Sequence, residues 1–150
     1  MARLWRGAQV VAVLLEDDFD LPAFKAELEA QLAALERSEI ASEALSKSFA
    51  MLVSSREEAL EFSNAYAPEH LVIQTDDADD YAEGVINAGS IFLGHFTPES
   101  VGDYASGTNH ALPTYGYARM YGGVSLDTFV KYITMQRLTE EGIQNVGPHV

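Results

Sequence analysis

The chain has 150 residues, of which 47% are hydrophobic, and this is enough for one globular domain with a core. Its formal net charge of −14 argues against binding to nucleic acid or to an anionic membrane surface, because both repel an acidic protein. There is no cysteine, which excludes disulfides, thiolate metal sites and a cysteine nucleophile, and which agrees with a reducing compartment.

The first apolar run, residues 8–15 (AQVVAVLL), is interpreted as a buried strand. Arg3 and Arg6 precede it, as in a signal peptide, but no small-residue cleavage site follows and the acidic stretch 16–20 comes next. No run approaches the roughly 20 apolar residues of a membrane span. We therefore expect a cytoplasmic protein, with an organelle such as the plastid as the alternative if a targeting peptide precedes this sequence.

Helix and strand signals alternate from residue 20 to residue 100. Asp20 can cap a first helix that has Pro22 in its first turn. Ser55 and Glu58 form a capping box, which predicts a helix that runs to about residue 66. The other predicted elements are a helix over 38–47, strands over 49–53, 70–74 and 90–94, a helix opened by the acidic residues 76–80 and ended by Gly89, and a helix with Thr97 as cap and Pro98 in its first position.

Strands that alternate with helices predict an α/β fold with a mostly parallel sheet and flanking helices. Residues 101–124 differ, since they are rich in glycine and tyrosine and show little periodicity, as functional loops often do. The tail is expected to form a short helix, a strand and a helix capped by Thr139. We divide the chain into two parts. Residues 1–124 form a core portion, and its loop over 97–124 is the candidate site. Residues 125–150 form a helix-strand-helix extension.

Two segments carry side chains suited to proton transfer or ligand binding. Glu69 and His70 stand side by side where a helix gives way to a strand, and Pro68 favours a turn there because it biases the preceding residue away from helix. They are interpreted either as a catalytic pair or as polar residues at a helix end. Asp103 and His110 suit a divalent metal or a polar substrate, although two ligands do not make a zinc site.

The other polar groups have structural interpretations. Asp76, Asp77, Asp79 and Asp80 lack the glycine and distal glutamate of a calcium loop, and acidic residues at a helix start stabilise the helix. His95 and His149 have no flanking ligand pattern. We expect no chemistry from these six residues.

Four stretches carry a family resemblance: NAYAPEHLVIQT, NAGSIFLG, TPESVGDYASGTNHALPTYGYARMYGGVSLDTF and ITMQRLTEEGIQNVGP. They resemble histidinol dehydrogenase, and the likeness runs from about residue 9 to the end of the chain. The resemblance implies a Rossmann-like α/β core and an intertwined homodimer. It also implies a zinc enzyme of histidine biosynthesis, which oxidises L-histidinol to L-histidine through the aldehyde with two NAD⁺.

The resemblance carries residue roles with it. Glu69 matches the family's glutamate that activates water for hydration of the aldehyde, and His70 matches the general base that also contacts substrate. Asp103 matches a zinc ligand that lies at the substrate as well, and His110 matches a histidine of the same loop near the substrate. No position of this chain matches a NAD-binding residue of the family.

The resemblance further implies that the chain is an incomplete part of a larger fold. In the family, a nucleotide-binding portion lies upstream, and a glutamine and a histidine that bind zinc precede the first strand, where this sequence has MARLWRG. The last histidine ligand and a substrate-binding glutamate lie beyond Val150. We therefore expect a histidinol dehydrogenase fragment in which Asp103 alone is too little for tight zinc binding. The alternatives are an inactive module that associates with itself or with a partner, and a small binder of imidazole-like ligands that uses His70, Asp103 and His110.

Overall fold

The computed structural model describes residues 9–15 and 19–150, and its strands form two parallel pairs. β1 (Val11–Leu15) pairs with β2 (Phe49–Val53), and β3 (His70–Ile73) pairs with β4 (Ser90–Leu93). The predicted α/β class with parallel strands and flanking helices is confirmed, but the described strands make two pairs rather than one sheet. The predictions that concern residues 1–8 and 16–18 lie outside the described residues.

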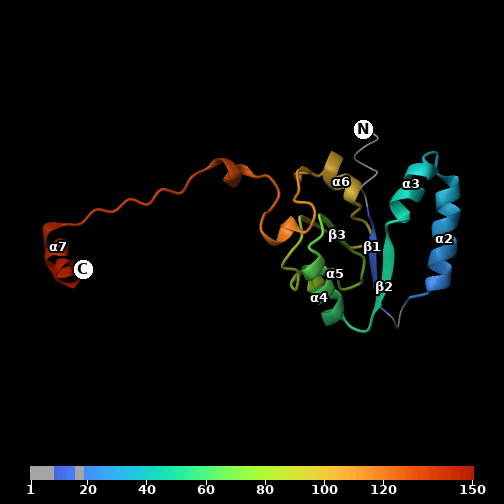
Figure 1. Ribbon diagram of the computed structural model, residues 1–150, viewed down its shortest axis with the longest axis horizontal. Helices are drawn as coiled ribbons and strands as arrows, with labels where there is room; N and C mark the ends of the chain where they lie inside the picture. Colours follow the sequence, from blue (N-terminus) through green and yellow to red (C-terminus); the bar gives the residue numbers. More distant parts are fainter. Residues whose placement is uncertain (1–8, 16–18) are drawn as a thin grey trace.

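Helices form the crossovers that parallel strands require. Asp20 starts the first of them by accepting from the N–H of Ala23 at 3.0 Å. Ser55 starts another by accepting from the N–H of Glu58 at 3.2 Å, while the Glu58 carboxylate reaches one residue further back than a capping box, to Ser54. The helices, in chain order (Figure 1), are α2 (Leu21–Ala34), α3 (Ser38–Leu45), α4 (Arg56–Tyr66), α5 (Ala78–Ala82) and α6 (Glu99–Tyr104).

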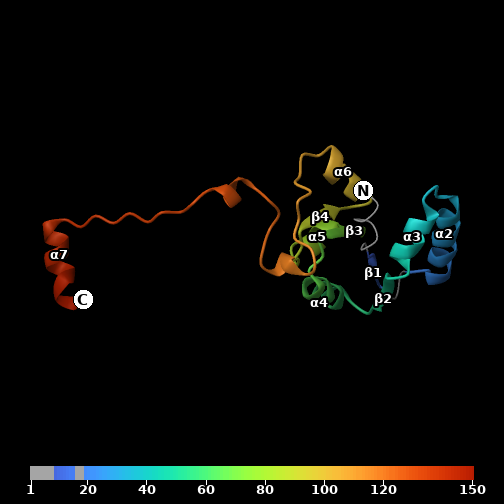
Figure 2. The ribbon, with the colours of Figure 1, turned by 45° about the horizontal axis from the view of Figure 1, so that its top comes forward.

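A small core connects the two strand pairs. Ile73 of β3 packs with Ala78 and Tyr81 of α5, and all three are buried. Leu15 of β1 and Leu60 of α4 pack against this cluster, so the first strand pair and the helix that follows it share one core with the second pair. α2 and α3 lie side by side at the far side of the β1–β2 pair (Figure 2), and neither helix has a buried residue.

Some predicted helix boundaries are wrong, and the helix expected over 38–47 ends at Leu45. The helix expected to end at Gly89 ends at Ala82, because the Asn64 side chain binds the backbone of the loop that follows, at Gly84, Ile86 and Asn87. The last helix of the core, α6, starts one residue later than predicted. Pro98 is its N-cap, and the Thr97 hydroxyl donates to the carbonyl of Leu93 instead of capping the helix.

The C-terminal tail extends away from the α/β body (Figures 1 and 2). It begins with a 3-10 turn, η3 (Leu126–Phe129), and it ends in α7 (Glu140–Val146), where Thr139 caps the helix as predicted, and in η4 (Gly147–His149). The strand expected between these elements is wrong, since residues 130–139 pair with no described strand and a lone strand has no stability of its own. The apolar side chains of this tail are exposed, among them Tyr132 (89%), Ile133 (80%) and Met135 (92%). The domain division at residue 124 stays a prediction.

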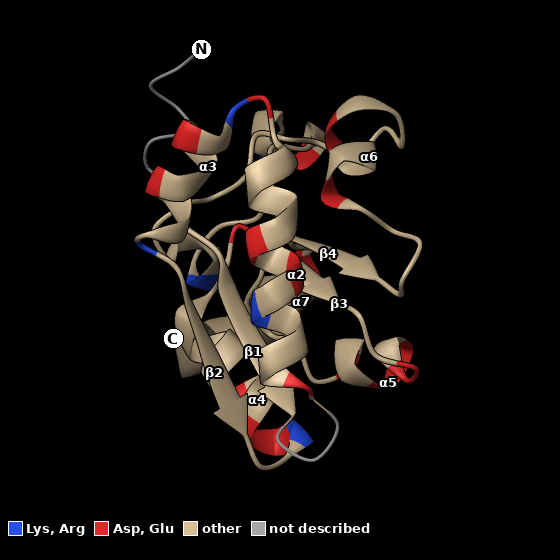
Figure 3. Cartoon of the chain, turned by 90° about the vertical axis from the view of Figure 1, so that its right-hand side faces the viewer, with Lys and Arg blue, Asp and Glu red and all other residues tan. Residues whose placement is uncertain are grey.

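Acidic residues dominate the charged surface of the body. Figure 3 shows Asp and Glu positions on α2, α3, α4, α5 and α6 with few Lys and Arg positions between them, as the 23 acidic and 9 basic residues of the chain imply. Among the described helices, none combines the length and the apolar character that crossing a membrane requires.

Candidate active site

A tight turn between α4 and β3 presents Glu69 and His70. It is made by Ala67, which has left-handed backbone angles (φ 54°, ψ 66°) and is 1% exposed. The Ala67 N–H donates to the carbonyl of Ser63 at 2.8 Å, as at many helix ends. A left-handed conformation costs an alanine about 1–2 kcal/mol. The surrounding packing therefore maintains a backbone shape that the alanine itself disfavours.

The glycine-rich loop supports this turn from the helix side. The Arg119 guanidinium donates to the carbonyl of Ala65, in the last turn of α4, where helix carbonyls lack partners within the helix. Gly116 lies beside the same helix end in a left-handed conformation (φ 76°). A Cβ atom at Gly116 would lie 3.6 Å from the carbonyl oxygen of Tyr66. The loop that the sequence marked as a functional candidate is thus in contact with the turn that carries the candidate pair.

Gly89 fixes the turn from the strand side. Its N–H donates to the carbonyl of Pro68 at 2.9 Å, and the N–H of Ser90 donates to the carbonyl of Glu69 at 2.9 Å. A Cβ atom at Gly89 would lie only 2.5 Å from that Glu69 oxygen, and 3.3 Å from the Cα and C atoms of the same residue. Two hydrogen bonds and a close backbone approach therefore determine where the backbone of Glu69 lies.

The His70 ring lies over the aromatic ring of Phe92 in the neighbouring strand. The ring centroids are 5.9 Å apart with an angle of 39° between the planes, and Phe92 is 5% exposed. α6 packs on the same phenylalanine through Gly102, where a Cβ atom would lie 2.6 Å from Phe92 Cε1. The missing side chain of Gly102 thus lets α6 come close to β4, and this brings the acidic residues of α6 to His70.

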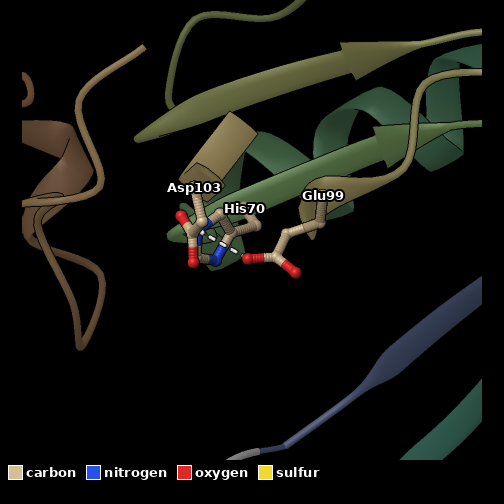
Figure 4. A group of neighbouring side chains, drawn as sticks. All are labelled: His70, Glu99 and Asp103. Carbon is tan, nitrogen blue, oxygen red and sulfur yellow. Dashed lines mark ion pairs between the residues drawn. The ribbon is translucent and has the colours of Figure 1, made fainter. Parts of the chain in front are cut away.

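Three titratable side chains meet at this point, as Figure 4 shows. The His70 Nε2 atom lies 3.6 Å from Glu99 Oε1, and one ligand atom from each of His70, Glu99 and Asp103 lies within 4.8 Å of the other two. Glu99 and Asp103 are four residues apart on α6 and so share one face of the helix. All three side chains are partly buried.

The carboxyl group of Glu99 is perturbed by its neighbours. Burial raises its pKa first, and the negative charge of Asp103 raises it further. The charge of His70 acts in the opposite direction, whereas a hydrogen bond with Asp103 and the charge of Glu69 again favour the protonated form. The pKa of Glu99 is therefore raised above its ordinary value, in a site where Glu69, His70 and Asp103 act on one carboxyl group.

The structure brings three of the four predicted site residues together. His70 and Asp103 lie beside Glu99, and Glu69, next to His70 in the chain, is near enough for its charge to help raise the pKa of Glu99. His110 is exposed and lies outside the group of His70, Glu99 and Asp103. Glu99 is the site residue that the sequence prediction missed. Its spacing of four from Asp103, on a segment already predicted to be helical, is the signal that could have identified it.

The donor set of this group suits a divalent cation. An imidazole nitrogen and two carboxylates are donors that zinc accepts. The ligand atoms of a tetrahedral zinc lie about 3.4 Å apart, given bonds of about 2.0–2.1 Å. Since the atoms here lie within 4.8 Å of one another, small side-chain rotations would bring them to such a distance.

The acidic residues at the start of α5 form a separate group with a structural partner. The Arg56 guanidinium lies 2.9 Å from Asp77 and 3.8 Å from Asp80, and it stacks 4.5 Å above the ring centroid of Tyr81. His95 Nε2 lies 3.5 Å from the carboxylate of Asp76 on the exposed surface. These contacts agree with the structural interpretation of the acidic stretch.

Known proteins match this chain over nearly its full length. The family model for histidinol dehydrogenase matches residues 4–150. The chloroplastic histidinol dehydrogenase of Oryza sativa subsp. japonica is 59% identical over 143 residues, which are 95% of this chain and 30% of that protein. The histidine biosynthesis trifunctional protein of Candida albicans is 49% identical over 142 residues, 94% of this chain and 17% of that protein. The chain thus spans less than a third of the length of these relatives.

A solved structure gives the same result. The crystal structure of histidinol dehydrogenase from Elizabethkingia anophelis superposes with a TM-score of 0.85 and 45% sequence identity, over 99% of this chain and 35% of that one. At this identity the likeness extends beyond the fold to the family. The chain belongs to the histidinol dehydrogenase family.

Proposed function

We propose that this chain carries the acid–base part of a histidinol dehydrogenase active site, which oxidises L-histidinol to L-histidine in histidine biosynthesis. The observation that carries the proposal is the cluster of His70, Asp103 and Glu69, because these residues match the family's catalytic and ligand positions and lie together in space. The two oxidation steps each transfer one hydride to NAD⁺ and together consume one water, so that two NADH and three protons are released per histidinol when histidine leaves as the carboxylate.

His70 acts as the general base in this proposal. It takes the proton of the alcohol as the carbon loses its hydride, and an imidazole is suited to this near neutral pH. Glu69 then deprotonates the water that adds to the aldehyde, and the hydrate is oxidised in the second step. The chain has no cysteine, which is compatible with this route, since a covalent thiohemiacetal needs a thiol.

Asp103 is proposed as a zinc ligand and, with His70 and His110, as a contact for histidinol. When bound, zinc would fix the imidazole and amino groups of the substrate as a Lewis acid. His70 is kept out of the ligand set here, because an imidazole nitrogen bound to a metal cannot take a proton. No residue of this chain is assigned to NAD.

The C-terminal tail supports a homodimer as the working unit. Its exposed apolar side chains, such as Tyr132 and Met135, are not covered by the other described residues, and surfaces of this kind mark sites of protein association. For the compartment we propose the cytoplasm, with the plastid as the alternative. Two plant relatives carry the word chloroplastic in their names.

The test places this chain in the corresponding segment of the rice relative, because the chain spans only 30% of that protein. The chimera should form NADH with L-histidinol, NAD⁺ and zinc. His70→Ala should lower kcat by about 10²–10⁴-fold, the usual contribution of a general base. His95→Ala, which removes an exposed histidine outside the site, should leave the rate within about twofold.

Other outcomes point to other functions. A folded, zinc-loaded chimera that makes no NADH would contradict the proposal and favour an inactive module that associates with itself or with a partner. Histidinol binding without turnover would favour the small imidazole binder. Full activity of the His70→Ala chimera would show that the base is another residue.

A further inference from the structure

One nitrogen of the His70 ring, Nε2, has an environment that the proposed reaction does not explain. Nε2 is buried, and it has no hydrogen-bond partner within 3.5 Å among the described residues. The group that faces it is the carboxylate of Glu99, whose Oε1 atom lies 3.6 Å away (Figure 4). A buried nitrogen costs free energy unless it makes a hydrogen bond. A shift of a few tenths of an ångström would provide one here.

The identity of this neighbour determines which ring nitrogen can act as a base. A neutral imidazole carries its hydrogen on one nitrogen only, and the other keeps a lone pair. At a pH where Glu99 is ionised, its carboxylate accepts but does not donate, so the nitrogen that faces it carries the hydrogen. With Glu99 at Nε2, the lone pair of His70 is at Nδ1.

We propose that Glu99 is a positioning residue for His70, which holds the hydrogen on Nε2, fixes the orientation of the ring and leaves Nδ1 to take the substrate proton. This assignment rests on the proposed function, in which His70 is the general base. It gives a role to a residue that neither the spacing of the sequence nor the family resemblance assigned.

Stabilisation of α6 alone does not explain Glu99. An acidic residue in the first turn favours a helix, but Asp103 lies one turn further on the same face, and like charges at this spacing destabilise a helix by a similar amount. The helix has only six residues, and its N-cap, Pro98, provides no side-chain hydrogen bond. The Glu99 side chain instead extends to the His70 ring, as Figure 4 shows.

The first measurement is nuclear magnetic resonance of the complete chain with ¹⁵N-labelled histidine, without histidinol, NAD⁺ or zinc. We expect the ring nitrogens of His70 to report the Nε2–H form, with a slowly exchanging, downfield Nε2–H proton. Glu99→Ala should abolish this proton signal, and Glu99→Asp should restore it in part. Glu57→Ala is the matched control, because Glu57 lies in the first turn of α4 and is exposed; it should leave the signal unchanged.

The same variants in the rice chimera give the kinetic measurement. Glu99→Ala should lower kcat about 10–100-fold with KM within about twofold, the size of effect known for carboxylates that orient metal-bound histidines. Glu99→Gln, which keeps the size of the side chain, replaces the alanine variant if that one fails to fold. The Glu99→Gln substitution should move the Nε2–H signal upfield and lower kcat, since a neutral amide oxygen accepts a weaker hydrogen bond from His70 than a carboxylate does.

The results separate this inference from the proposed function. An Nδ1–H form in the unmodified chain, or an Nε2–H signal that persists in Glu99→Ala, would overturn the positioning role even if the chimera were active. A kcat unchanged in Glu99→Ala would overturn it as well. A chimera without histidinol turnover, together with the expected spectra, would contradict the proposed function while the Glu99–His70 contact stands.

Discussion

Substitution of Gly89 by alanine tests whether the close approach of two backbones holds the site. The added Cβ would lie 2.5 Å from the carbonyl oxygen of Glu69, a distance that Cβ atoms do not tolerate. A flexible side chain could move aside, but this oxygen belongs to the backbone and accepts a hydrogen bond from Ser90 at 2.9 Å. The clash must therefore move the segment that carries Glu69 and His70.

The expected cost follows from this geometry. Overpacking of a tight contact costs about 1–3 kcal/mol, and each kcal/mol lowers the melting temperature of a protein of about this size by roughly 2–4 °C. Gly89→Ala should therefore lower the melting temperature by about 2–12 °C. In the rice chimera it should also lower kcat, because a displacement of a catalytic group by about 1 Å can cost about 100-fold in rate.

The measurement is thermal unfolding by calorimetry, together with the amide chemical shifts of Glu69 and His70. Gly122→Ala is the control, since a Cβ atom there has no neighbour within 4 Å and its φ is not positive. It should be neutral, or stabilising by up to about 1 kcal/mol through the unfolded state. If both alanine variants melt at the same temperature and the shifts of Glu69 stay constant, the backbone contact does not determine the turn.

Three further outcomes are expected. Arg119→Ala should destabilise the chain by about 0.5–1.5 kcal/mol in urea unfolding, because the last turn of α4 loses a hydrogen-bond donor. Arg119→Lys should retain part of this stability. An unchanged stability in Arg119→Ala would contradict the contact. Asn64→Ala should cost about 1.5–4.5 kcal/mol, since its side chain makes hydrogen bonds to three backbone groups of residues 84–87; Asn64→Asp, which keeps the acceptor, should cost less. Hydrogen bonds from Ser54 lower the pKa of Glu58, so its contribution is present above the unfolded pKa and is lost as the pH falls through the folded pKa. Glu58→Gln should then reduce stability at neutral pH but not in acid, and a constant difference across the titration would contradict this.

Three helix starts could be predicted because their causes are local. Asp20, Ser55 and Thr139 each accept a hydrogen bond from a backbone N–H three residues later, and this pattern is visible in the sequence. Helix ends and unpaired segments depend on distant partners. α5 ends early because Asn64 binds residues about 20 positions away in the chain. No pattern within the 76–89 window contains that information.

The tail shows the same limit for strands. The sequence analysis predicts a strand within residues 130–139, but a strand is stable only where another backbone offers an edge. No described strand lies beside this segment. The sequence therefore predicted an extended conformation for this segment, but it could not predict whether a partner strand lies beside it.

The site was predictable in its chemistry and not in its assembly. Glu69 and His70 could be found because two proton-transfer groups stand beside Pro68, and Asp103 because the sequence assigned it to an aperiodic loop, although it lies on α6. What joins them is the close packing of glycine backbones, with Gly89 against Glu69 and Gly102 against Phe92.

Glycines reveal little about their partners in a sequence, since a missing side chain has no chemistry to recognise. Their effect here is to bring α6 and the loop before β4 within contact of the His70 turn, which is why Glu99 reaches the ring. The arrangement of Glu69 and His70 thus depends as much on the absence of Cβ atoms at Gly89 and Gly102 as on the carboxylates around them. Substitution of Gly89 or Gly102 should therefore displace the His70 side chain before it unfolds the chain.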